Sequence, residues 1–368
     1  MKILEIEKEQ LLKPLQTVSG IVERRHTLPI LSNILLEIKG SNLRLLATDL
    51  EIQVSTTLAL PTTLPDHAIT ASARKMLDIL RALPDKTSLS LDAGDSKLQV
   101  KAGKSRFNLQ TLPAQDFPTM ADTAVDGTGF SLPQKQFRKL LSLVQYGMAQ
   151  QDIRYYLNGL LLVAEENQIV LVATDGHRLA YASCPMVASQ AKTEAIIPRK
   201  AILEVAKLLT DSDDEVRIDL FPGQVRFSFS GVSLISKTID GKFPDYTRVI
   251  PVNYSKHFVL DRLVLQQALQ RASILSNDKF RGVRWVLTSD CLKIVCTNAE
   301  QEEAEEELEI DYNGDALDIG FNITYLLDVL ANIDSPKIDC AMGDANSSML
   351  MSIPENQQFK YVVMPMRI

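Results

Sequence analysis

Three short segments of the chain repeat one another at intervals of about a third of its length. They read LRLLATD, IVLVATD and LKIVCTN, and each ends in a threonine followed by Asp or Asn. The threonines are Thr48, Thr174 and Thr297, which are almost evenly spaced along the 368 residues. Self-similarity at a fixed period is the signature of a repeated structural unit. The sequence therefore predicts three homologous domains.

Apolar residues at helical spacing flank each repeated segment in the same order. The stretches before the segments contain Leu11, Leu15, Val18 and Val22; Phe137, Leu140, Leu141, Val144 and Met148; and Leu265, Ala268, Leu269 and Ala272. The later stretches contain Met76, Leu77, Leu80 and Leu83; Ile202, Val205, Ala206 and Leu209; and Leu326, Val329, Leu330 and Ile333. Pro133 suits a helix start, whereas Pro14 predicts a kink or a late first turn. With β-rich runs such as NILLEI and VRFSFSG between them, we expect an α+β fold, two helices on antiparallel sheet in each domain.

The junctions between the repeats define the expected domains. We place them after Asp126, behind the segment TLPAQDFP, and after Asn253, behind FPDYTRVIPV. The domains are then residues 1–126, 127–253 and 254–368. Neither junction is a long flexible linker, and short joints between like domains predict a rigid array.

The charge of the chain is unevenly distributed. A net charge of −7 would ordinarily disfavour nucleic-acid binding, but much of the acid lies in the run QEEAEEELEID at residues 301–311. Basic side chains recur on the predicted helices of all three domains: Lys13, Arg24, Arg25, Arg74, Lys75, Lys135, Arg138, Lys139, Arg199, Lys200, Lys207, Arg262 and Arg271. Any one pair would ordinarily be a solvated helix face, but the recurrence favours a single basic surface.

Helix geometry permits this surface to surround DNA. Two helices per domain would give twelve in a dimer, and at roughly 10 Å spacing their axes would trace a circle of about 120 Å. The hole would be roughly 28 Å wide, and a duplex of roughly 20 Å would pass through it with room for water. Loose contacts would attract DNA without regard to sequence and still allow sliding.

Neither a membrane segment nor a cofactor site is expected. No apolar run approaches the length of a membrane helix, and MKILEIEKEQ lacks a signal-peptide core, so we expect a cytoplasmic protein. Cys184, Cys291, Cys296 and Cys340 form no CxxC pair or metal-ligand grouping. We interpret them as reduced, buried thiols and expect neither metal nor cofactor.

The whole chain resembles the bacterial DNA polymerase III β subunits, the β sliding clamps. The resemblance rests on LLKPLQTVSG, TLPILSN, LLATDLE, SRFNLQTLPAQDFP, QDIRYYLNG, VATDGHRLA, IPRK, DGKFPDY, ILSNDKFRGVR, EQEEAEE and YVVMPMRI. It implies a non-catalytic processivity factor, a head-to-tail homodimeric ring closed around double-stranded DNA. It also implies partners: an ATP-driven clamp loader, the replicative polymerase catalytic subunit, other DNA polymerases, and mismatch-repair and ligase-type proteins that bind through short peptides.

The resemblance also implies three sets of site residues. Those near DNA are Arg25, Arg74, Gln151, Tyr155, Tyr156, Arg199 and Phe280. Those of a partner-peptide pocket are Leu157, Thr174, Gly176, His177, Arg178, Leu179, Pro244, Arg248, Val249, Ser348, Val362, Met364, Pro365, Met366 and Arg367. Those of the dimer interface are Lys75, Lys104, Arg106, Phe107 and Leu109 of one chain and Ile274, Leu275, Glu300, Glu302, Glu303, Glu305 and Glu306 of the other. Met and Leu would give the pocket adaptable apolar walls, and His177 and Arg178 polar edges.

Other interpretations of the same residues stay open. The pair Tyr155 and Tyr156 suits core packing as well as DNA contact, and the acidic run suits a solvated strand edge. The sequence TDGHR suggests acid-base catalysis, but the matching repeats read TDLE and TNAE and carry no nucleophile motif or phosphate loop. A protein-interaction scaffold that does not encircle DNA would keep the repeats but would not need basic helices in every domain.

Overall fold

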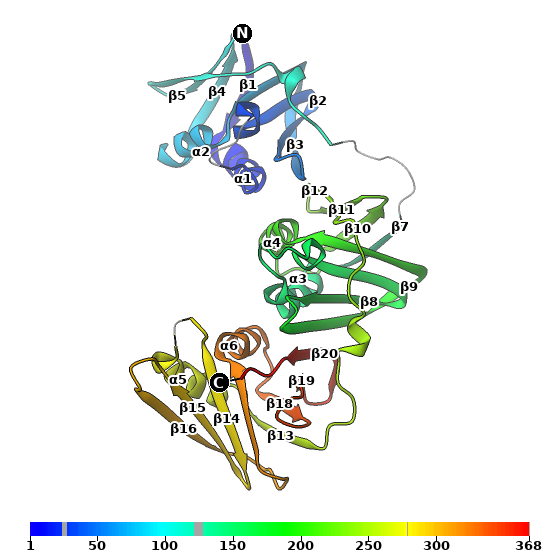
Figure 1. Cartoon of the computed structure of the whole chain (residues 1–368). Coiled ribbons are helices and arrows are strands. Elements are labelled where there is room, and N and C mark those ends of the chain that lie inside the picture. The colour runs from blue at the N-terminus through cyan, green and yellow to red at the C-terminus, as the bar shows by residue number, and fades with distance from the viewer. Residues whose placement is uncertain (24–27, 121–127, 278, 368) are drawn as a thin grey trace. The chain divides into compact units, whose positions relative to one another are not determined.

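The computed structural model describes residues 1–23, 28–120, 128–277 and 279–367 (Figure 1). It contains two compact units. One unit consists of Met1–Phe137 and Leu203–Thr238, and the other of Arg138–Ile202 and Ile239–Ile368. The middle repeat is thus divided between them. The reason lies in the sheets, since this repeat contributes strands to one sheet with the first repeat and to another with the third.

The first two repeats have the same order of elements, and a helix forms in each of the six predicted helical stretches. The first contains β1 (Lys2–Glu7), α1 (Lys8–Ser19), β2 (Asn33–Thr48), β3 (Ile52–Ser72), α2 (Ala73–Ala82), β4 (Ser88–Ala93), β5 (Lys97–Ala102) and β6 (Ser105–Gln110). The second contains β7 (Thr128–Pro133), α3 (Gln134–Val144), β8 (Gly159–Thr174), β9 (Arg178–Pro198), α4 (Arg199–Leu208), β10 (Glu215–Phe221), β11 (Gln224–Phe229) and β12 (Val232–Lys237). The α+β prediction is confirmed.

The third repeat differs because its two long strands are each broken in two. It contains β13 (Lys256–Asp261), α5 (Arg262–Ala272), β14 (Gly282–Thr288), β15 (Cys291–Thr297), β16 (Glu303–Glu309), β17 (Leu317–Asn322), α6 (Ile323–Asn332), β18 (Lys337–Met342), β19 (Met349–Ile353) and β20 (Asn356–Val363). The single strands β2 and β3 of the first repeat therefore correspond to β14 with β15 and to β16 with β17.

The sheets are antiparallel, and two of them cross the repeat junctions. One has the order β2-β3-β12-β11-β10-β7 and another β13-β18-β19-β20-β9-β8. In the first, β3 pairs with β12 from Ile52 opposite Ser236 to Thr56 opposite Val232. In the second, β9 pairs with β20, the last strand of the next repeat. Two four-stranded sheets, β1-β4-β5-β6 and β16-β15-β14-β17, complete the units.

Polar caps and apolar stripes explain where the helices begin and what they cover. The side chain of Asp261 accepts a hydrogen bond from the Val264 amide at the start of α5, and Asn322 caps α6. In α1, the apolar face is fully buried against α2, β2 and β3, and α1 and α2 lie side by side (Figure 1). Pro14 lies inside α1, which already begins at Lys8. The expectation of a late first turn at Pro14 was therefore wrong.

A hydrogen-bonded turn follows each repeated segment and explains its Asp or Asn. In each turn a side-chain oxygen accepts hydrogen bonds from two backbone amides further along the chain. The bonds join Asp49 to Glu51 (2.9 Å) and Ile52 (2.7 Å), Asp175 to His177 (2.9 Å) and Arg178 (3.1 Å), and Asn298 to Glu300 (3.1 Å) and Glu302 (2.9 Å). The motif that revealed the repeat is thus a structural one.

Among the described residues, no helix has the length and apolar character that crossing a membrane requires.

Candidate functional site

The predicted peptide-pocket residues of the middle and third repeats meet where β9 pairs with β20. Thr174 donates a hydrogen bond to the Arg178 carbonyl at 2.6 Å, which closes the turn between β8 and β9. The His177 carbonyl then accepts from the Met364 amide at 2.9 Å. Val362 lies opposite Leu179 in the strand pair. Residues almost two hundred positions apart are therefore held together by backbone bonds.

An apolar cluster forms the floor beside this strand pair. Leu179 and Val362 are buried in it with Phe243, while Tyr156 and Tyr246 pack against it half-buried. The segment that begins at Phe243 brings the predicted residues Pro244, Arg248 and Val249 to the same place, and all three are exposed. The Arg248 side chain is solvent-facing and pairs with Asp245 at 3.0 Å. Buried strand residues and exposed loop residues are thus brought together, as a peptide-binding surface requires.

Two further predicted pocket residues lie at the ends of elements in the same unit. Leu157 is buried in a short 3-10 helix, Tyr155–Leu157, and its carbonyl accepts from the Ala149 amide at 3.0 Å. Ser348 is half-buried and directly precedes β19, whose first residue, Met349, pairs with Val363. His177 and Gly176 are exposed in the turn before β9.

Arg178 is turned inward instead of giving the groove a polar edge. Its guanidinium donates to the carboxylates of Asp175 (3.0 Å) and Asp328 (2.6 Å) and to the Tyr146 carbonyl (2.7 Å). It also lies 4.3 Å from the centre of the Tyr325 ring, and its side chain is 10% exposed. Burial lowers the pKa of Arg178, but Tyr361 and the two carboxylates outweigh it and the pKa rises. The charge therefore locks the β8–β9 turn to α6.

The end of the chain reaches a different hollow. Met366 and Arg367 line a space of about 360 Å³ together with Asn277, Phe280 and Thr297. The Met366 amide donates to the Gly320 carbonyl at 2.8 Å, which fixes the tail beside the sheet of the third repeat. Half-buried Pro365 precedes it, and 48% of Met364 is exposed. The last predicted pocket residues thus share a hollow with Phe280, which the resemblance predicts near DNA.

Among the residues predicted near DNA, the tyrosine pair divides into two environments. Tyr155 is 58% exposed, whereas half-buried Tyr156 packs against the apolar cluster. Their rings meet edge to face, with centres 5.8 Å apart. Gln151 is exposed just before them with a φ of 57°, in the left-handed region. Phe280 is 57% exposed, and the Lys279 ammonium lies 5.3 Å from its ring centre.

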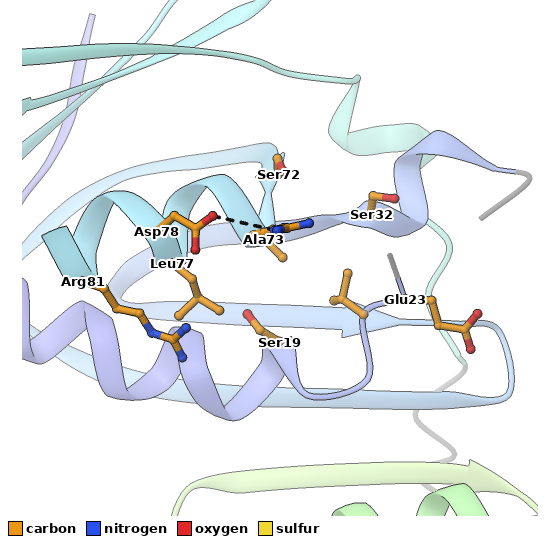
Figure 2. A pocket seen from close by; sticks show the side chains of 10 residues that line it. Ser19, Glu23, Ser32, Ser72, Ala73, Leu77, Asp78 and Arg81 are labelled. Atoms are coloured by element: carbon orange, nitrogen blue, oxygen red, sulfur yellow. Dashed lines mark ion pairs between the residues drawn. The ribbon is translucent and has the colours of Figure 1, made fainter. Parts of the chain in front are cut away.

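The predicted arginines have unequal access to solvent. Arg199 is half-buried and donates to the Met148 carbonyl at 3.2 Å; burial, with the nearby charge of Arg178, lowers its pKa. Arg74 is exposed and lines a hollow of about 510 Å³. Ser19, Asp78 and Arg81 also line this hollow (Figure 2). The Arg74 Nε is 3.8 Å from Asp78 Oδ2. Arg25 lies outside the described residues.

The residues predicted for the dimer interface occupy two strands and their surroundings. Arg106, Phe107 and Leu109 belong to β6, and Lys104 is exposed in the turn before it; Lys75 is exposed on α2. Glu303, Glu305 and Glu306 belong to β16, with Glu300 and Glu302 exposed just before it. Ile274, 76% exposed, and half-buried Leu275 follow α5. In the described sheets, β6 and β16 each have a neighbour on one side only.

Several of these acids already have partners within the chain. Glu306 accepts two hydrogen bonds from Arg271, at 2.7 and 2.5 Å, and the Arg271 guanidinium is the largest cause of its lowered pKa. Glu305 pairs with Lys293 at 2.6 Å. Over the described ranges, no group of three or more His, Cys, Asp or Glu is arranged to hold a metal ion.

Sequence reasoning missed Asp328, Tyr181 and Tyr246. Nothing local to Asp328 signals its bond with Arg178, because 150 positions separate them. Tyr181 could have been found from its spacing, since it lies two residues after Leu179 in a strand and shares its face. Tyr246 lies beside Arg248 in the loop segment FPDYTRV.

The repeated two-helix, antiparallel architecture defines the class as a three-domain clamp fold, and the comparisons with known proteins identify the family. Three domain descriptions match: the DNA polymerase III beta subunit N-terminal domain over residues 1–121, central domain over 131–245 and C-terminal domain over 247–367. The beta sliding clamp of Pseudomonas aeruginosa is 47% identical over 364 residues, and that of Escherichia coli K12 is 42% identical over 363, each match covering 99% of both chains. The crystal structure of the Pseudomonas aeruginosa DNA polymerase III subunit beta superposes with a TM-score of 0.96, 47% identity and complete coverage of both chains.

The chain belongs to the DNA polymerase III β subunit family, whose members are sliding clamps and not catalytic subunits. The resemblance inferred from the motifs is therefore confirmed. The sequence TDGHR is correspondingly part of a structural turn and not of an active site.

Proposed function

We propose that this chain closes head to tail with a second copy into a ring around duplex DNA and tethers a polymerase to it. The observation that carries the proposal is a strand pairing that recurs between successive repeats. The last strand of one repeat pairs with the β3-type strand of the preceding repeat, as β12 does with β3 and β20 with β9. If the pattern continues between chains, β6, the last strand of the first repeat, pairs with β16 of another chain, because β16 corresponds to the start of β3.

The chemistry of the two free edges supports this pairing. The β6 side carries Lys104 and Arg106, and the β16 side carries Glu300, Glu302 and Glu303. Phe107 and Leu109 would meet the strongly exposed Ile274 and its neighbour Leu275, which gives an apolar centre between opposite charges. Glu305 and Glu306 would contribute less, since they are already neutralised by Lys293 and Arg271.

The same proposal assigns the basic helices to DNA. Exposed Arg74 and the residues Gln151, Tyr155, Tyr156, Arg199 and Phe280 would approach the duplex or a single-stranded template, as would Arg25. Weak contacts with phosphates suffice, because a closed ring retains DNA by topology and needs no tight grip. Half-burial of Arg199 and Tyr156 makes Arg74, Tyr155 and Phe280 the stronger candidates.

The groove at β9 and β20 would bind short peptides of partner proteins. The partners we propose are the replicative polymerase catalytic subunit, the clamp loader, other DNA polymerases, and mismatch-repair and ligase-type proteins. An apolar floor with exposed Met364, Val249 and His177 around it suits several related peptides in competition. We propose domains at residues 1–126, 127–253 and 254–368, and a cytoplasmic protein, since bacterial DNA lies in that compartment.

The decisive experiment is loader-assisted retention of the protein on nicked circular DNA at high salt, before and after the circle is cut. A topological clamp stays on circles and leaves linear DNA through its ends. Equal behaviour on both forms contradicts encirclement and favours a scaffold or an ordinary DNA binder.

A variant pair ties the result to the proposed interface. Ile274→Asp places a charge in the apolar centre, so it should convert the dimer to monomer and abolish retention on circles. Val259→Asp adds the same charge to another exposed apolar position, 38% exposed in β13, and should keep both properties. Light scattering of the two variants measures the oligomeric state independently of DNA.

A further inference from the structure

We propose that the peptide groove continues along the same sheet face into a second groove, which binds the residues flanking the partner's binding peptide. The occupant we infer is an extended segment with a large apolar side chain and a basic one. This inference rests on the proposed peptide site and adds a specificity-determining surface to it.

The second groove lies on the face of the β8–β9 sheet that carries Leu179 and Val362, beside the segment that leads to the third repeat. It encloses about 420 Å³. Buried Val163 and Val170 form its floor, and half-buried Tyr181, Tyr246 and Ile250 form its walls. Val252, which is 78% exposed, lies at its mouth. A strongly exposed valine beside two half-exposed tyrosines is an apolar surface without an intramolecular cover in the described chain.

Strand register makes this groove a continuation of the first. Val362 lies opposite Leu179, and two residues along each strand Lys360 lies opposite Tyr181. Residues two apart share one face of a sheet, and the step between them is roughly 7 Å. Leu179 and Val362 belong to the same apolar cluster as Val163 and Val170. The two grooves therefore share one floor.

The segment between the middle and third repeats also connects the two grooves. Arg248 and Val249, predicted for the peptide groove, lie between Tyr246 and Ile250, which line the second groove. An extended peptide advances by about the same distance per residue as the strand beneath it. A side chain two to four residues beyond the first groove would therefore reach the tyrosines.

The charges around the tyrosines define the chemistry of the occupant. Glu165 and Glu166 are exposed at the rim, and Glu194 lies close enough to share Lys192 with Glu165, at 3.9 and 3.7 Å. Burial raises the pKa of Tyr246, and Tyr181, Glu165, Glu194 and Asp245 raise it further. Carboxylates therefore lie close enough to Tyr246 to raise its pKa, although Lys192 pairs with Glu165 and Glu194.

The tyrosine rings can hold both parts of such an occupant. Tyr181 and Tyr246 have ring centres 6.0 Å apart, and the Lys360 ammonium already lies 5.6 Å from the centre of the Tyr181 ring. A second cation would be attracted to the side of Tyr246, where the acids lie. The stem of a Lys or Arg can cover a tyrosine while its charge reaches Glu165 or Glu166.

The test compares peptides of defined length by fluorescence polarisation with the full-length protein. The short probe is the clamp-binding segment of the replicative polymerase catalytic subunit. Longer probes carry Leu-Lys-Leu-Lys or Gly-Ser-Gly-Ser at one end or the other. We expect the Leu-Lys extension at one end to tighten binding about tenfold, a gain of about 1.4 kcal/mol, and the Gly-Ser extension to give no gain.

Two variants and a charge control test whether the second groove causes the gain in affinity. The double change Glu165→Lys with Glu166→Lys should remove the gain while the short probe binds as before. Tyr181→Ala should remove the gain when the extended probe is compared with the short probe on the same variant. The exposed residue Glu215 of β10 lies outside the groove, and Glu215→Lys should retain the gain. A photoreactive phenylalanine in the extension, mapped by mass spectrometry, should cross-link to the segment 246–252.

The outcomes separate the two proposals. If the short probe does not bind, the peptide site itself fails. If the short probe binds but the Leu-Lys extension adds nothing at either end, or its gain survives all the groove variants, the second groove is overturned and the peptide site stands. Cross-links confined to residues outside the groove would overturn it equally.

Discussion

The turn after β2 and the turn after β8 have the same backbone and opposite surroundings. In the first, residues 48–52, Thr48 donates to the Ile52 carbonyl at 2.9 Å; in the second, residues 174–178, Thr174 donates to the Arg178 carbonyl at 2.6 Å. The last residue of the first turn is Ile52, 1% exposed in an apolar core. The last residue of the second is Arg178, paired with two carboxylates. One repeated turn therefore serves packing in one place and a joint between repeats in the other.

The largest difference between the turns is expected for their last residues. Arg178→Met removes a buried charge and the guanidinium that donates to Asp175, Asp328 and the Tyr146 carbonyl, which costs about 3–5 kcal/mol of unfolding free energy. Ile52→Val removes one methyl group and costs about 1 kcal/mol. Urea unfolding measures the loss of unfolding free energy in both variants. Hydrogen exchange at the Met364 amide, which donates to the His177 carbonyl, reports on the joint itself. Equal losses in the two variants would mean that the inward arginine does not stabilise the joint.

The next difference concerns the aspartates that form the turns. Asp49→Ala and Asp175→Ala each leave two backbone amides without their acceptor, a loss of about 1–3 kcal/mol. Asp175→Ala also removes an ion pair with Arg178 in which both side chains are largely buried, so it should cost about 1–2 kcal/mol more. Thermal unfolding of the two variants side by side checks the order, and a larger loss at Asp49 would contradict it.

Substitutions of the third residue of each turn should have opposite effects on the stability of the protein. Leu50 has a φ of 76° and Gly176 one of 88°, where side chains are disfavoured. Gly176→Ala should destabilise by about 1–2 kcal/mol, because of φ and because its Cβ would lie 2.8 Å from the Arg154 guanidinium. Leu50→Asn should stabilise by up to about 1 kcal/mol, since Asn tolerates this conformation. Calorimetry that finds the same sign for both would argue against backbone strain at Leu50.

The smallest effect is a shift in titration beside the second turn. Arg154 donates to the Asp175 carbonyl and to Asp152, and its hydrogen bond is the main reason that the pKa of Asp152 falls from 3.8 to about 2. Because the folded pKa is depressed, the stabilisation is complete above pH of about 4 and is lost as the pH falls towards 2. Arg154→Gln should return the pKa towards 3.8. Carbon NMR of the carboxyl group measures it; an unchanged midpoint would refute the role of Arg154.

Periodicity predicted what depends on neighbours along the chain. The threonine segments, the apolar stripes of α1 to α6 and the α+β class follow from local patterns, and the structure has them. The pairing of β3 with β12 could not be predicted, because the two strands lie far apart in the sequence and no local pattern sets their register. The direction of Arg178 likewise depends on Asp328, which lies on α6 and has no signature of its own.

The candidate site was predictable to a similar degree. The resemblance named candidate pocket residues on β9 and β20, and the strand pair brings these together. It did not indicate that Met366 and Arg367 line a hollow with Phe280, because the path of the last residues is fixed by a backbone bond to Gly320. Tyr181 was missed because a tyrosine in a strand ordinarily signals packing and not a binding surface.

The sheet that runs from β2 through β12 has a consequence for synthesis on the ribosome. The edge of β3 is complete once residue 72 has left the exit tunnel, but its partner β12 ends at residue 237. At about 5–20 residues per second, the nascent chain would display an unpaired strand edge for on the order of ten seconds. Such an edge invites pairing with neighbouring nascent chains. During this interval, pairing between neighbouring nascent chains competes with the pairing of β3 and β12 in one chain.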